Sequence, residues 1–545
     1  MVRAQNTLDV QARRARRRHR PRFARVARVV AVVAVCTVAL AGCFGNGVHR
    51  VGSPLTSQQM PPGLWRSLGG SECSWARVGG SAVTGTSTHT NGPQYVQIDG
   101  SDAGLTVDQC LPFWQDPGPF ARPLAQPGSP FGDGDFRVGS EVAAGTYSAT
   151  FPAGQRCSWA NVSGFHGMEQ GRNPDATRSG SSTNGFASVL ISPFDYGFTS
   201  QGCGQWQPLN LPAAPGGATT SGVLVDGVAQ DLPDPYTVRI DDPTQCHGGP
   251  APCYYTFSTE SGFLGLINVP VVRSSDLVHW TWAGPPNTSL LGAAGAAPGK
   301  DAMPVLAPWA QFAGNWAPSV VVRPNNPPSA RYVMYYTARS KDNSAWGGKE
   351  CTGVATSARV DGPYVDSANA PLICVPAAGG TIDPSPFVAA DGTLSLEYAD
   401  DIGIHAQNIT PDGLRLAGGE QLLLRADGGY IWEIVRAEGP SMISTPESGI
   451  LLFYSVNLFT SPDYAVGVAR CDTPLGPCRR LYSTPVLAKR GAMLGPGGQA
   501  PVQLPDGSWR LMFHAWDNVV GYDAGGDRTL HVLPLTFPGG NPQVG

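Results

Sequence analysis

The second half of the chain repeats one β-strand pattern five times, and this repetition constrains the fold more than any other feature. Each copy has a strand start that contains proline, followed by a strand rich in Tyr, Phe and Leu. The starts lie roughly 55 to 85 residues apart, and helical periodicity is almost absent after Leu232. Such repeats are typical of β-propellers, whose four-stranded blades surround a central channel. The sequence therefore predicts an all-β fold with a five-bladed propeller; a (β/α)8 barrel fits poorly because it needs eight helices.

The five strand starts share a proline, and three of them carry an acidic residue. They are Asp234-Pro235-Tyr236-Thr237-Val238, Ala317-Pro318-Ser319-Val320-Val321, Asp383-Pro384-Ser385-Pro386-Phe387, Glu438-Gly439-Pro440-Ser441-Met442 and Gln499-Ala500-Pro501-Val502. The strands expected next are 254–257, 332–336, 394–398, 451–454 and 511–514. Because the first strand of each blade lines the channel, equivalent positions on different blades face one another. We therefore expect Asp234, Asp383 and Glu438 at equivalent positions around the hub.

Three carboxylates in one funnel are electrostatically unfavourable, and this indicates a function. A glycosidase needs one carboxyl group to protonate the leaving oxygen and another to activate water or attack the sugar carbon. Crowding supplies the two different pKa values, because a like-charged neighbour raises the pKa of the group least able to stay ionised. A purely structural explanation is that Asp-Pro favours a turn at a strand start. It does not explain acids on three of five starts.

Six short stretches of the second half occur in the order found in one known family. They are Asp234-Pro235, residues 269–280, residues 316–320, Asp361-Gly362-Pro363-Tyr364, Ile382-Asp383-Pro384 and Glu438-Gly439-Pro440. Together, over roughly residues 230 to 538, they resemble glycoside hydrolase family 43, the inverting arabinanases, arabinofuranosidases and xylosidases with a five-bladed propeller. The resemblance implies that Asp234 is the general base and Glu438 the general acid. It also implies that Asp383 orients the acid and adjusts its pKa.

Further residues are candidates for binding substrate, and one is a candidate for binding metal. The substrate candidates are Trp316, Arg436, Trp432 and Trp516. The three Trp side chains are possible sugar platforms, although a place in the core fits each equally well. Many members of the family that the chain resembles have Gly-Pro-Gly-His in the fifth blade, beside a central metal ion, whereas residues 495–499 read Gly-Pro-Gly-Gly-Gln. No cofactor is therefore expected to be required, and a structural Ca²⁺ is doubtful, with His514 as its one candidate ligand.

A shorter repeat occupies residues 51–115 and 136–207. Each copy contains a Cys-Ser-Trp-Ala motif, short β-rich runs between Gly and Ser turns, and a later Cys followed by a Trp. The pattern predicts a small β-sandwich stapled by one disulfide, and it resembles a small module of secreted and lipid-anchored proteins. Trp75 and Trp159 are possible sugar platforms, but a Trp beside a disulfide is more often part of a core.

The N-terminus has the order of charges of an export signal. Ten Arg residues precede an uncharged apolar run, Val29–Ala41, which is too short for a membrane-spanning helix of about 20 residues. Leu40-Ala41-Gly42-Cys43 then resembles the lipobox of bacterial lipoproteins and predicts a lipid on Cys43. The expected domains are 1–42 (signal), 51–115 and 136–207 (repeats), 208–222 (Pro/Gly linker) and 223–545 (propeller). We expect the protein on the outer face of the cell membrane as a lipoprotein, or secreted.

Charge and cysteine content agree with an exported protein that acts on carbohydrate. Without residues 1–42, 27 basic and 40 acidic residues remain, a net charge of about −13 before His. This sign argues against nucleic acid as a partner. Ten Cys remain besides Cys36 and Cys43, and as sequential neighbours they would form disulfides. The expected pairs are Cys73–Cys110, Cys157–Cys203, Cys246–Cys253, Cys351–Cys374 and Cys471–Cys478. A zinc site is less favoured because no Cys-x-x-Cys occurs.

These features together predict an extracellular, inverting glycoside hydrolase. It would act as a monomer on arabinofuranosyl or xylosyl linkages of polysaccharides or oligosaccharides, with its lipid as the only contact with a membrane. One alternative is a non-catalytic lipoprotein that binds cell-envelope polysaccharide. The other is a retaining, invertase-like propeller hydrolase, for which the expected Asn-Asp-Pro start is absent. The sequence does not distinguish the exact sugar, nor endo from exo cleavage.

Overall fold

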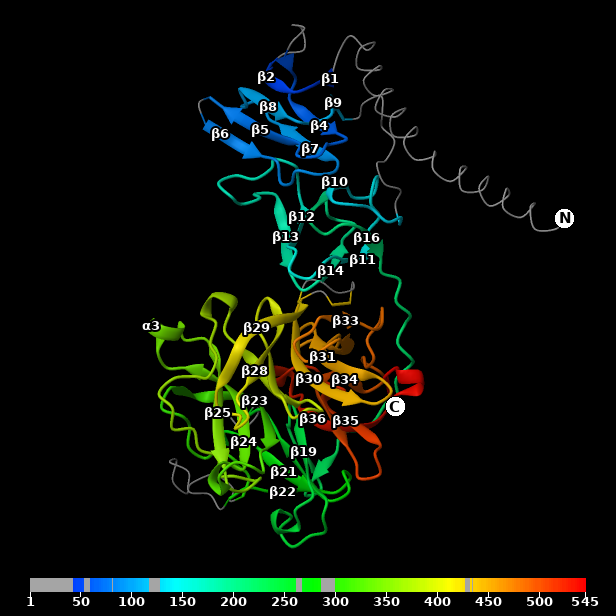
Figure 1. The fold of residues 1–545 in the computed structure, drawn as a ribbon. Coiled ribbons are helices and arrows are strands. Elements are labelled where there is room, and N and C mark those ends of the chain that lie inside the picture. The colour runs from blue at the N-terminus through cyan, green and yellow to red at the C-terminus, as the bar shows by residue number, and fades with distance from the viewer. Residues whose placement is uncertain are drawn as a thin grey trace, which may run out of the picture. The chain divides into compact units, whose positions relative to one another are not determined.

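The structure is a computed structural model that describes residues 43–545 except 53–58, 81, 117–127, 261–266, 286–298, 427–431 and 434 (Figure 1). The predicted signal, residues 1–42, lies outside the described residues, and lipid attachment at Cys43 stays a prediction. Within the described ranges, no helix has the length and apolar character to cross a membrane. The described residues form two compact units, one within residues 43–208 except Ser188–Leu190, the other made of Ser188–Leu190 and the described part of residues 209–545.

Both units are built of β-strands. The helical elements of the described residues are α3 (Asn343–Trp346) and the 3-10 helices η1 (Pro243–Gln245), η2 (Pro328–Ala330), η3 (Pro376–Ala378), η4 (Tyr522–Ala524) and η5 (Pro538–Gly540). The predicted all-β fold class is therefore confirmed.

The first unit contains two copies of one β-sandwich. The strands of the first copy are β1 (Cys43–Phe44), β2 (Gly47–Val51), β3 (Gln59–Met60), β4 (Gly63–Ser67), β5 (Ser74–Gly79), β6 (Ala82–Thr86), β7 (Gln94–Ile98), β8 (Gly104–Asp108) and β9 (Phe113–Gln115). Those of the second are β10 (Gly134–Arg137), β11 (Gly145–Thr150), β12 (Cys157–Val162), β13 (Ala176–Ser182), β14 (Phe186–Ile191), β15 (Gly197–Gln201) and β16 (Trp206–Pro208). In both copies the strands pair in the same way: β4 lies between β7 and β9 as β11 lies between β14 and β16, and β5 lies between β6 and β8 as β12 lies between β13 and β15.

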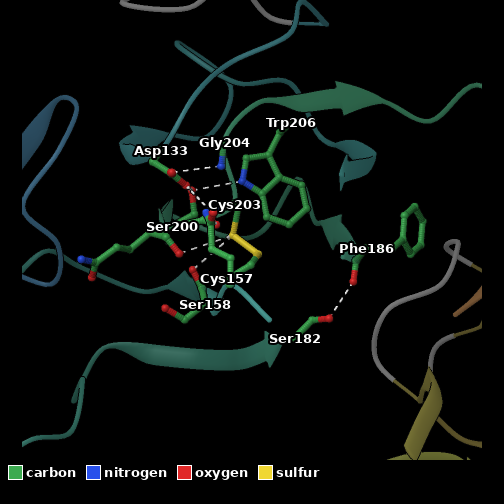
Figure 2. The surroundings of a disulfide bond; sticks show 12 residues. Asp133, Cys157, Ser158, Ser182, Phe186, Ser200, Cys203, Gly204 and Trp206 are labelled. Carbon is green, nitrogen blue, oxygen red and sulfur yellow. Dashed lines mark hydrogen bonds between the residues drawn. A yellow bond between two sulfur atoms is a disulfide. The ribbon is translucent and has the colours of Figure 1, made fainter. Parts of the chain in front are cut away.

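Each copy is stapled by one disulfide beside a buried Trp. The bonds join Cys73 to Cys110 and Cys157 to Cys203. Around the second bond, Asp133 accepts hydrogen bonds from the backbone N–H of Cys203 and from Ser200, and Ser200 in turn accepts one from the Trp206 indole (Figure 2). Trp75 and Trp159 are only 4% and 7% exposed, so both lie in the sandwich cores rather than on a ligand-binding face.

The two copies pack on each other through buried charges. Arg66 of the first copy forms an ion pair with Glu141 of the second at 2.5 Å, with both side chains at most 3% exposed. His89 lies 2.9 Å from Asp135, which also accepts the backbone N–H of Tyr95. Because these buried charges are paired with charges of opposite sign, the copies form one compact unit, although each has its own core.

The second unit contains five sheets arranged as the blades of a propeller, antiparallel except for one parallel pair, β17 with β22, in blade one (Figure 1). Blade one consists of β17 (Leu224–Val225), β18 (Val228–Ala229), β19 (Tyr236–Ile240), β20 (Cys253–Phe257), β21 (Val271–Ser274) and β22 (Trp280–Trp282). Blades two and three consist of β23 (Ala310–Val322), β24 (Tyr332–Ser340), β25 (Glu350–Ser357), β26 (Ile382–Val388), β27 (Leu394–Ala399), β28 (Gly403–Ile409) and β29 (Leu416–Arg425). Blades four and five consist of β30 (Ala437–Thr445), β31 (Gly449–Val456), β32 (Ala465–Cys471), β33 (Cys478–Arg480), β34 (Met493–Gln503), β35 (Trp509–Asp517), β36 (Arg528–Thr536) and β37 (Gln543–Val544).

The first strands of neighbouring blades contact one another, so β19, β23, β26, β30 and β34 surround the hub. The chain segment before β19 also joins blade five to blade one. Val223 donates its backbone N–H to Leu530, and Leu232 donates its own to Arg528, both on β36. Three disulfides, Cys246–Cys253, Cys351–Cys374 and Cys471–Cys478, connect segments within single blades.

Candidate active site

Every blade has one residue with positive φ where its first strand reaches the hub. These residues are Asp234 (51°), Ala317 (42°), Asp383 (57°), Gly439 (57°) and Gly498 (56°). In blades two to five the strand pairing shifts at this point, as in a β-bulge. Bulges redirect side chains and are frequent beside active sites, and positive φ is uncommon for non-glycine residues. Together with the residues that follow them, the five positions line a hub cavity of about 30 Å³.

The bulges show which residues of the five strand starts are equivalent, and the alignment made from the sequence differs from theirs in blade four. Asp234 and Asp383 occupy equivalent hub positions, but Glu438 stands one residue earlier, because the equivalent residue of blade four is Gly439. Strand register shows the same offset: Glu438 pairs with Ser455 as Trp316 pairs with Thr337. The expectation that all three acids are equivalent was therefore wrong by one residue, because a bulge changes which side chain faces the hub.

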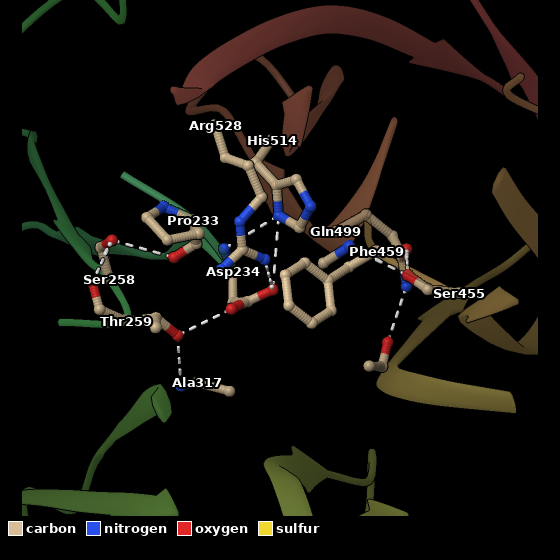
Figure 3. Close-up of polar contacts among 12 residues, drawn as sticks. Pro233, Asp234, Ser258, Thr259, Ala317, Ser455, Phe459, Gln499, His514 and Arg528 are labelled. Carbon is tan, nitrogen blue, oxygen red and sulfur yellow. Dashed lines mark hydrogen bonds and ion pairs between the residues drawn. The ribbon is translucent and has the colours of Figure 1, made fainter. Parts of the chain in front are cut away.

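Asp234 lies beside Arg528, His514 and Thr259 (Figure 3). Its Oδ2 accepts a hydrogen bond of 2.7 Å from Thr259, and its Oδ1 lies 3.5 Å from the buried guanidinium of Arg528. The backbone N–H of Asp234 donates to Nδ1 of His514. Burial alone would raise the pKa of the Asp234 carboxyl, but the charge of Arg528 and the hydrogen bond from Thr259 lower it well below the usual range. Asp234 is therefore a carboxylate that stays ionised.

His514 contributes as a neutral imidazole. Burial and the charge of Arg528 lower its pKa to about 4. Its Nδ1 accepts the backbone N–H of Asp234, so the tautomer with the proton on Nε2 fits this hydrogen bond. The contact of 3.3 Å between Nδ1 and Oδ1 of Asp234 is then not an ion pair at neutral pH. The positive charge next to Asp234 belongs to Arg528.

Glu438 lies on β30 in a less polar environment and is 7% exposed. Its Oε1 accepts a hydrogen bond of 2.8 Å from the Tyr464 hydroxyl, and its Oε2 lies 3.3 Å from Nε of Arg436. Burial raises the pKa of the Glu438 carboxyl, and the nearby Asp234 adds to the rise. Arg436 and Tyr464 offset only part of this effect. Glu438 therefore retains a proton at a pH at which Asp234 has lost its own.

Asp383 interacts electrostatically with both Asp234 and Glu438. Burial raises the pKa of its carboxyl well above the usual value, and the charges of Glu438 and Asp234 raise it further. Its Oδ2 accepts the backbone N–H of Gly439 at 2.9 Å, directly after Glu438 in the chain. Thus the structure brings all three predicted acids together in one hub, with one carboxyl held ionised and two held towards protonation.

Comparison with known proteins agrees with this geometry. The profile of glycosyl hydrolases family 43 matches residues 236–542, more than half of the chain. The chain belongs to glycosyl hydrolases family 43. It is accordingly a glycosidase, as the sequence predicted. The second sandwich copy matches the Rv1352-like extracellular domain over residues 129–207, which together with the disulfides suggests export.

Solved structures of family 43 resemble the propeller. A thermostable family-43 glycoside hydrolase is 25% identical, with coverage of 60% of this chain and 96% of that one, and a TM-score of 0.46. An endo-1,4-β-xylanase of Bacteroides thetaiotaomicron is 22% identical, with coverage of 58% and 95% and a TM-score of 0.43. An endo-arabinase of the same organism is 17% identical, with coverage of 58% and 98% and a TM-score of 0.41. No curated protein matches the sequence.

The candidate substrate-binding residues of this family-43 domain separate into two groups. Arg436 is partly exposed and connects Glu438 to Asp401 at 2.9 Å. Trp316 is partly exposed at the position equivalent to Glu438 on blade two, and Trp432 borders a pocket of about 410 Å³. Trp516, in contrast, is 0% exposed and donates its indole N–H to the backbone carbonyl of Phe459. Of the two interpretations of Trp516, the place in the core is the one that fits, and a sugar platform is excluded because the ring packs inside blade five.

The residues at the hub centre do not fit a central metal ion, which the sequence had left in doubt because residues 495–499 lack the Gly-Pro-Gly-His of many family members. Nδ1 of His514 is occupied by a backbone N–H, and within the described ranges no group of three or more His, Cys, Asp or Glu residues could hold a metal. A side chain in place of Gly498 would clash, because its Cβ would lie 2.6 Å from Oδ1 of Asp234. Glycine here makes room for the candidate base rather than for a ligand.

Sequence reasoning missed Thr259, Tyr464 and Arg528. Arg528 is buried under three aromatic rings, those of Phe459, Trp516 and Tyr522. No sequence motif marks Arg528 or Tyr464. Thr259 had a usable signal, a polar residue just after an expected strand: it stands two residues beyond 254–257, and Thr337 and Ser455 stand one residue beyond 332–336 and 451–454.

Proposed function

We propose that this family-43 glycosidase hydrolyses arabinofuranosyl or xylosyl linkages with inversion, using Asp234 as general base and Glu438 as general acid. The observation that carries the proposal is the opposite effect of the hub on the two carboxyl groups. Arg528 and Thr259 lower the pKa of Asp234, whereas burial and like charge raise the pKa of Glu438. A base and an acid that work at the same pH need this difference.

In the proposed reaction the ionised Asp234 takes a proton from a water molecule as the water oxygen attacks the anomeric carbon. The bond from that carbon to the leaving oxygen breaks, and the protonated Glu438 gives its proton to that oxygen. Asp234 ends protonated and Glu438 ends ionised, so one exchange of protons with solvent restores both groups. No covalent bond forms between the protein and the sugar, and the configuration at the anomeric carbon inverts.

Asp383 would act on the acid in two ways. The two buried carboxyl groups repel each other when both are ionised, so Asp383 and Glu438 each oppose the loss of the other's proton. The hydrogen bond that Asp383 accepts from the N–H of Gly439 fixes the backbone directly after Glu438. Both effects keep the proton of Glu438 available and correctly directed without direct participation of Asp383 in bond breaking.

We assign the leaving group to the pocket beside blade four. Because Glu438 protonates the leaving oxygen, the leaving group must lie on the side of Glu438. The pocket of about 410 Å³ shares Tyr464 with Glu438 and has an apolar wall that includes Trp432, Val435 and Leu458. An indole beside small apolar side chains suits the apolar face of a sugar ring. On the pocket rim, Lys489 pairs with Asp463 at 2.7 Å, and this partly exposed ion pair offers polar groups for the hydroxyls of the sugar.

The choice of pentosides follows the family resemblance of the motifs around the three acids, and the export signal agrees with a polymer outside the cell. Attachment to the membrane through Cys43 belongs to the same proposal. In this arrangement the lipid would hold the enzyme at the cell surface while the propeller acts on polysaccharide. Replacement of Cys43 by Ser should release the active protein into the medium of an expressing culture.

The test of the proposed function uses the purified full-length protein with 4-nitrophenyl α-L-arabinofuranoside and β-D-xyloside, and with arabinan and xylan. We expect hydrolysis of at least one of them, and loss of activity in Glu438→Gln and Asp234→Asn proteins that remain folded. Proton NMR during the first minutes should show the product with the anomeric configuration opposite to that of the substrate. Retained configuration, or no activity on any of these pentosides, would refute the proposal.

A further inference from the structure

A ring of hydrogen bonds links the blades at the hub. In four blades, a second-strand side chain accepts the backbone N–H of the positive-φ residue of the next blade. The pairs are Thr259 with Ala317 (2.8 Å), Thr337 with Asp383 (3.0 Å), Ser455 with Gly498 (2.9 Å) and His514 with Asp234 (3.0 Å). The last pair closes the ring between blades five and one. In blade three the equivalent residue is Ala399, which has no polar side chain, and the carboxylate of Asp383 accepts the N–H of Gly439 in its place.

Thr259 differs from the other hydroxyl groups of the ring. Since its oxygen accepts the N–H of Ala317, its own proton is directed elsewhere, and it donates that proton to Oδ2 of Asp234 at 2.7 Å. Ser455 donates to the amide oxygen of Gln499 instead. Unlike Ser455, Thr259 thus donates its proton to a carboxyl group of the site (Figure 3).

The surroundings hold this hydroxyl in place. Thr259 is buried, and its backbone N–H donates to the carbonyl of Pro233, next to Asp234 in the chain. Because Thr is β-branched and both hydrogen bonds of its oxygen are made, its side chain has little rotational freedom. The second contact of Thr259, Ala317, directly follows Trp316, the candidate sugar platform. One hydroxyl therefore connects the candidate base to the strand that carries a candidate substrate-binding ring.

We propose that Thr259 is a positioning residue for the general base: its hydroxyl fixes the rotation of the Asp234 carboxylate and its distance from blade two. This inference rests on the proposed function of Asp234. Oδ2 is held by Thr259 while Oδ1 lies towards Arg528, so the carboxylate plane is set from both sides. A hydrogen bond donated to the ionised form also favours that form, so its loss should raise the pKa of the base.

The test compares three variants of the full-length protein. Thr259→Val keeps the shape and removes the hydroxyl, and Thr259→Ser keeps the hydroxyl. Thr256→Val is the matched control, because Thr256 is a buried threonine of the same blade that shares a 2.7 Å hydrogen bond with Thr237 and touches no carboxyl group of the site. For Thr259→Val we expect kcat to fall about tenfold with little change in KM, as for loss of a hydrogen bond to a charged group. The acidic limb of kcat/KM should move to higher pH, because the carboxylate protonates more readily.

Thr259→Ser should keep the wild-type acidic limb and most of the activity, and Thr256→Val should lose thermal stability without any shift of that limb. The proposal is overturned if Thr259→Val has the wild-type pH profile, if Ser is as impaired as Val, or if Thr256→Val shifts the limb equally. A crystal structure of Thr259→Val gives a readout independent of activity and should show a rotated Asp234 carboxylate. If the wild-type protein hydrolyses no glycoside, the proposed function fails, whereas an unrotated carboxylate contradicts the positioning role alone.

Discussion

Buried acids are present in both units of the molecule, but they are balanced in different ways. In the sandwich unit each has a cation of its own, as in the pairs Arg66–Glu141 and Arg77–Asp102. In the hub of the propeller three carboxyl groups meet, and among the described residues Arg528 is their one deeply buried cation, since Arg436 is 38% exposed and His514 is neutral. A buried acid that is paired with a cation contributes to a stable structure. Clustered carboxyl groups with too few cations repel one another, and this repulsion lowers stability.

This difference separates structural acids from functional ones. A paired acid should matter for stability and leave catalysis unaffected, because its removal strands a buried cation. An acid in the hub should matter for catalysis, and its removal should relieve repulsion. Each of the substitutions below tests one side of this contrast.

The largest effect is expected for Glu438→Gln. Without a proton donor, kcat/KM for a glycoside with a poor leaving group should fall by about 10²–10⁴-fold. The thermal midpoint should not decrease, since a neutral amide replaces a carboxyl group under repulsion. Steady-state kinetics and calorimetry on the same preparation measure both. A large loss of stability together with the loss of activity would make Glu438 a structural acid and remove the contrast.

The second-largest effect is expected in the sandwich unit, where a substitution should lower stability and leave activity unchanged. Glu141→Gln leaves the buried Arg66 without its counter-ion, and the unit should lose about 3 kcal/mol of unfolding free energy. Activity on a soluble aryl glycoside should stay within about twofold of wild type, the change expected from a substitution that touches no catalytic group. Glu169→Gln, at an exposed position of the same unit, is the control and should alter neither quantity. Chemical denaturation followed by Trp fluorescence gives the stability; an unchanged midpoint for Glu141→Gln would contradict the prediction.

Asp383→Asn should stabilise the protein at neutral pH by about 1 kcal/mol while reducing activity. The pKa of this carboxyl is higher in the folded than in the unfolded state, so the wild-type protein loses unfolding free energy as pH rises through that folded-state pKa. The Asn variant avoids this loss, so its advantage should grow with pH above about 4, the ordinary pKa of Asp. Thermal unfolding at several pH values tests the slope, with the exposed Asp391→Asn as control. An advantage that shrank as pH rose would have the wrong sign.

The smallest effect concerns Arg436→Met. Arg436 lowers the pKa of Glu438, so its removal should raise that pKa and move the basic limb of the kcat/KM profile to higher pH. The guanidinium is partly exposed, so water screens its charge and the shift should stay below about one pH unit. A basic limb that stays at the same pH or moves to lower pH would show that Arg436 does not lower the pKa of Glu438. The acidic limb, which belongs to Asp234, should not move.

The blades could be predicted from sequence because their second strands are dense apolar and aromatic runs. The expected strand 254–257 corresponds to β20 (Cys253–Phe257), and 332–336 lies within β24 (Tyr332–Ser340). The one-residue offset of Glu438 could not be predicted from sequence. It depends on a backbone position with positive φ, and the residue at that position differs among the blades: Asp, Ala, Asp, Gly and Gly. The electrostatic partners were missed for a related reason: Arg528 is nearly 300 residues from Asp234 in sequence and is brought to it only by closure of the ring.

The most direct test of the central claim, that the hub acids perform the chemistry, is the dependence of the Glu438→Gln defect on the leaving group. A series of aryl glycosides with phenols of increasing acidity is hydrolysed by wild type and variant, and the ratio of kcat/KM is plotted against the pKa of the phenol. If Glu438 donates the proton, the defect shrinks steadily as the phenol becomes more acidic and nearly vanishes for 2,4-dinitrophenol, which leaves without protonation. A defect of equal size across the series would contradict the assignment of Glu438 as the acid.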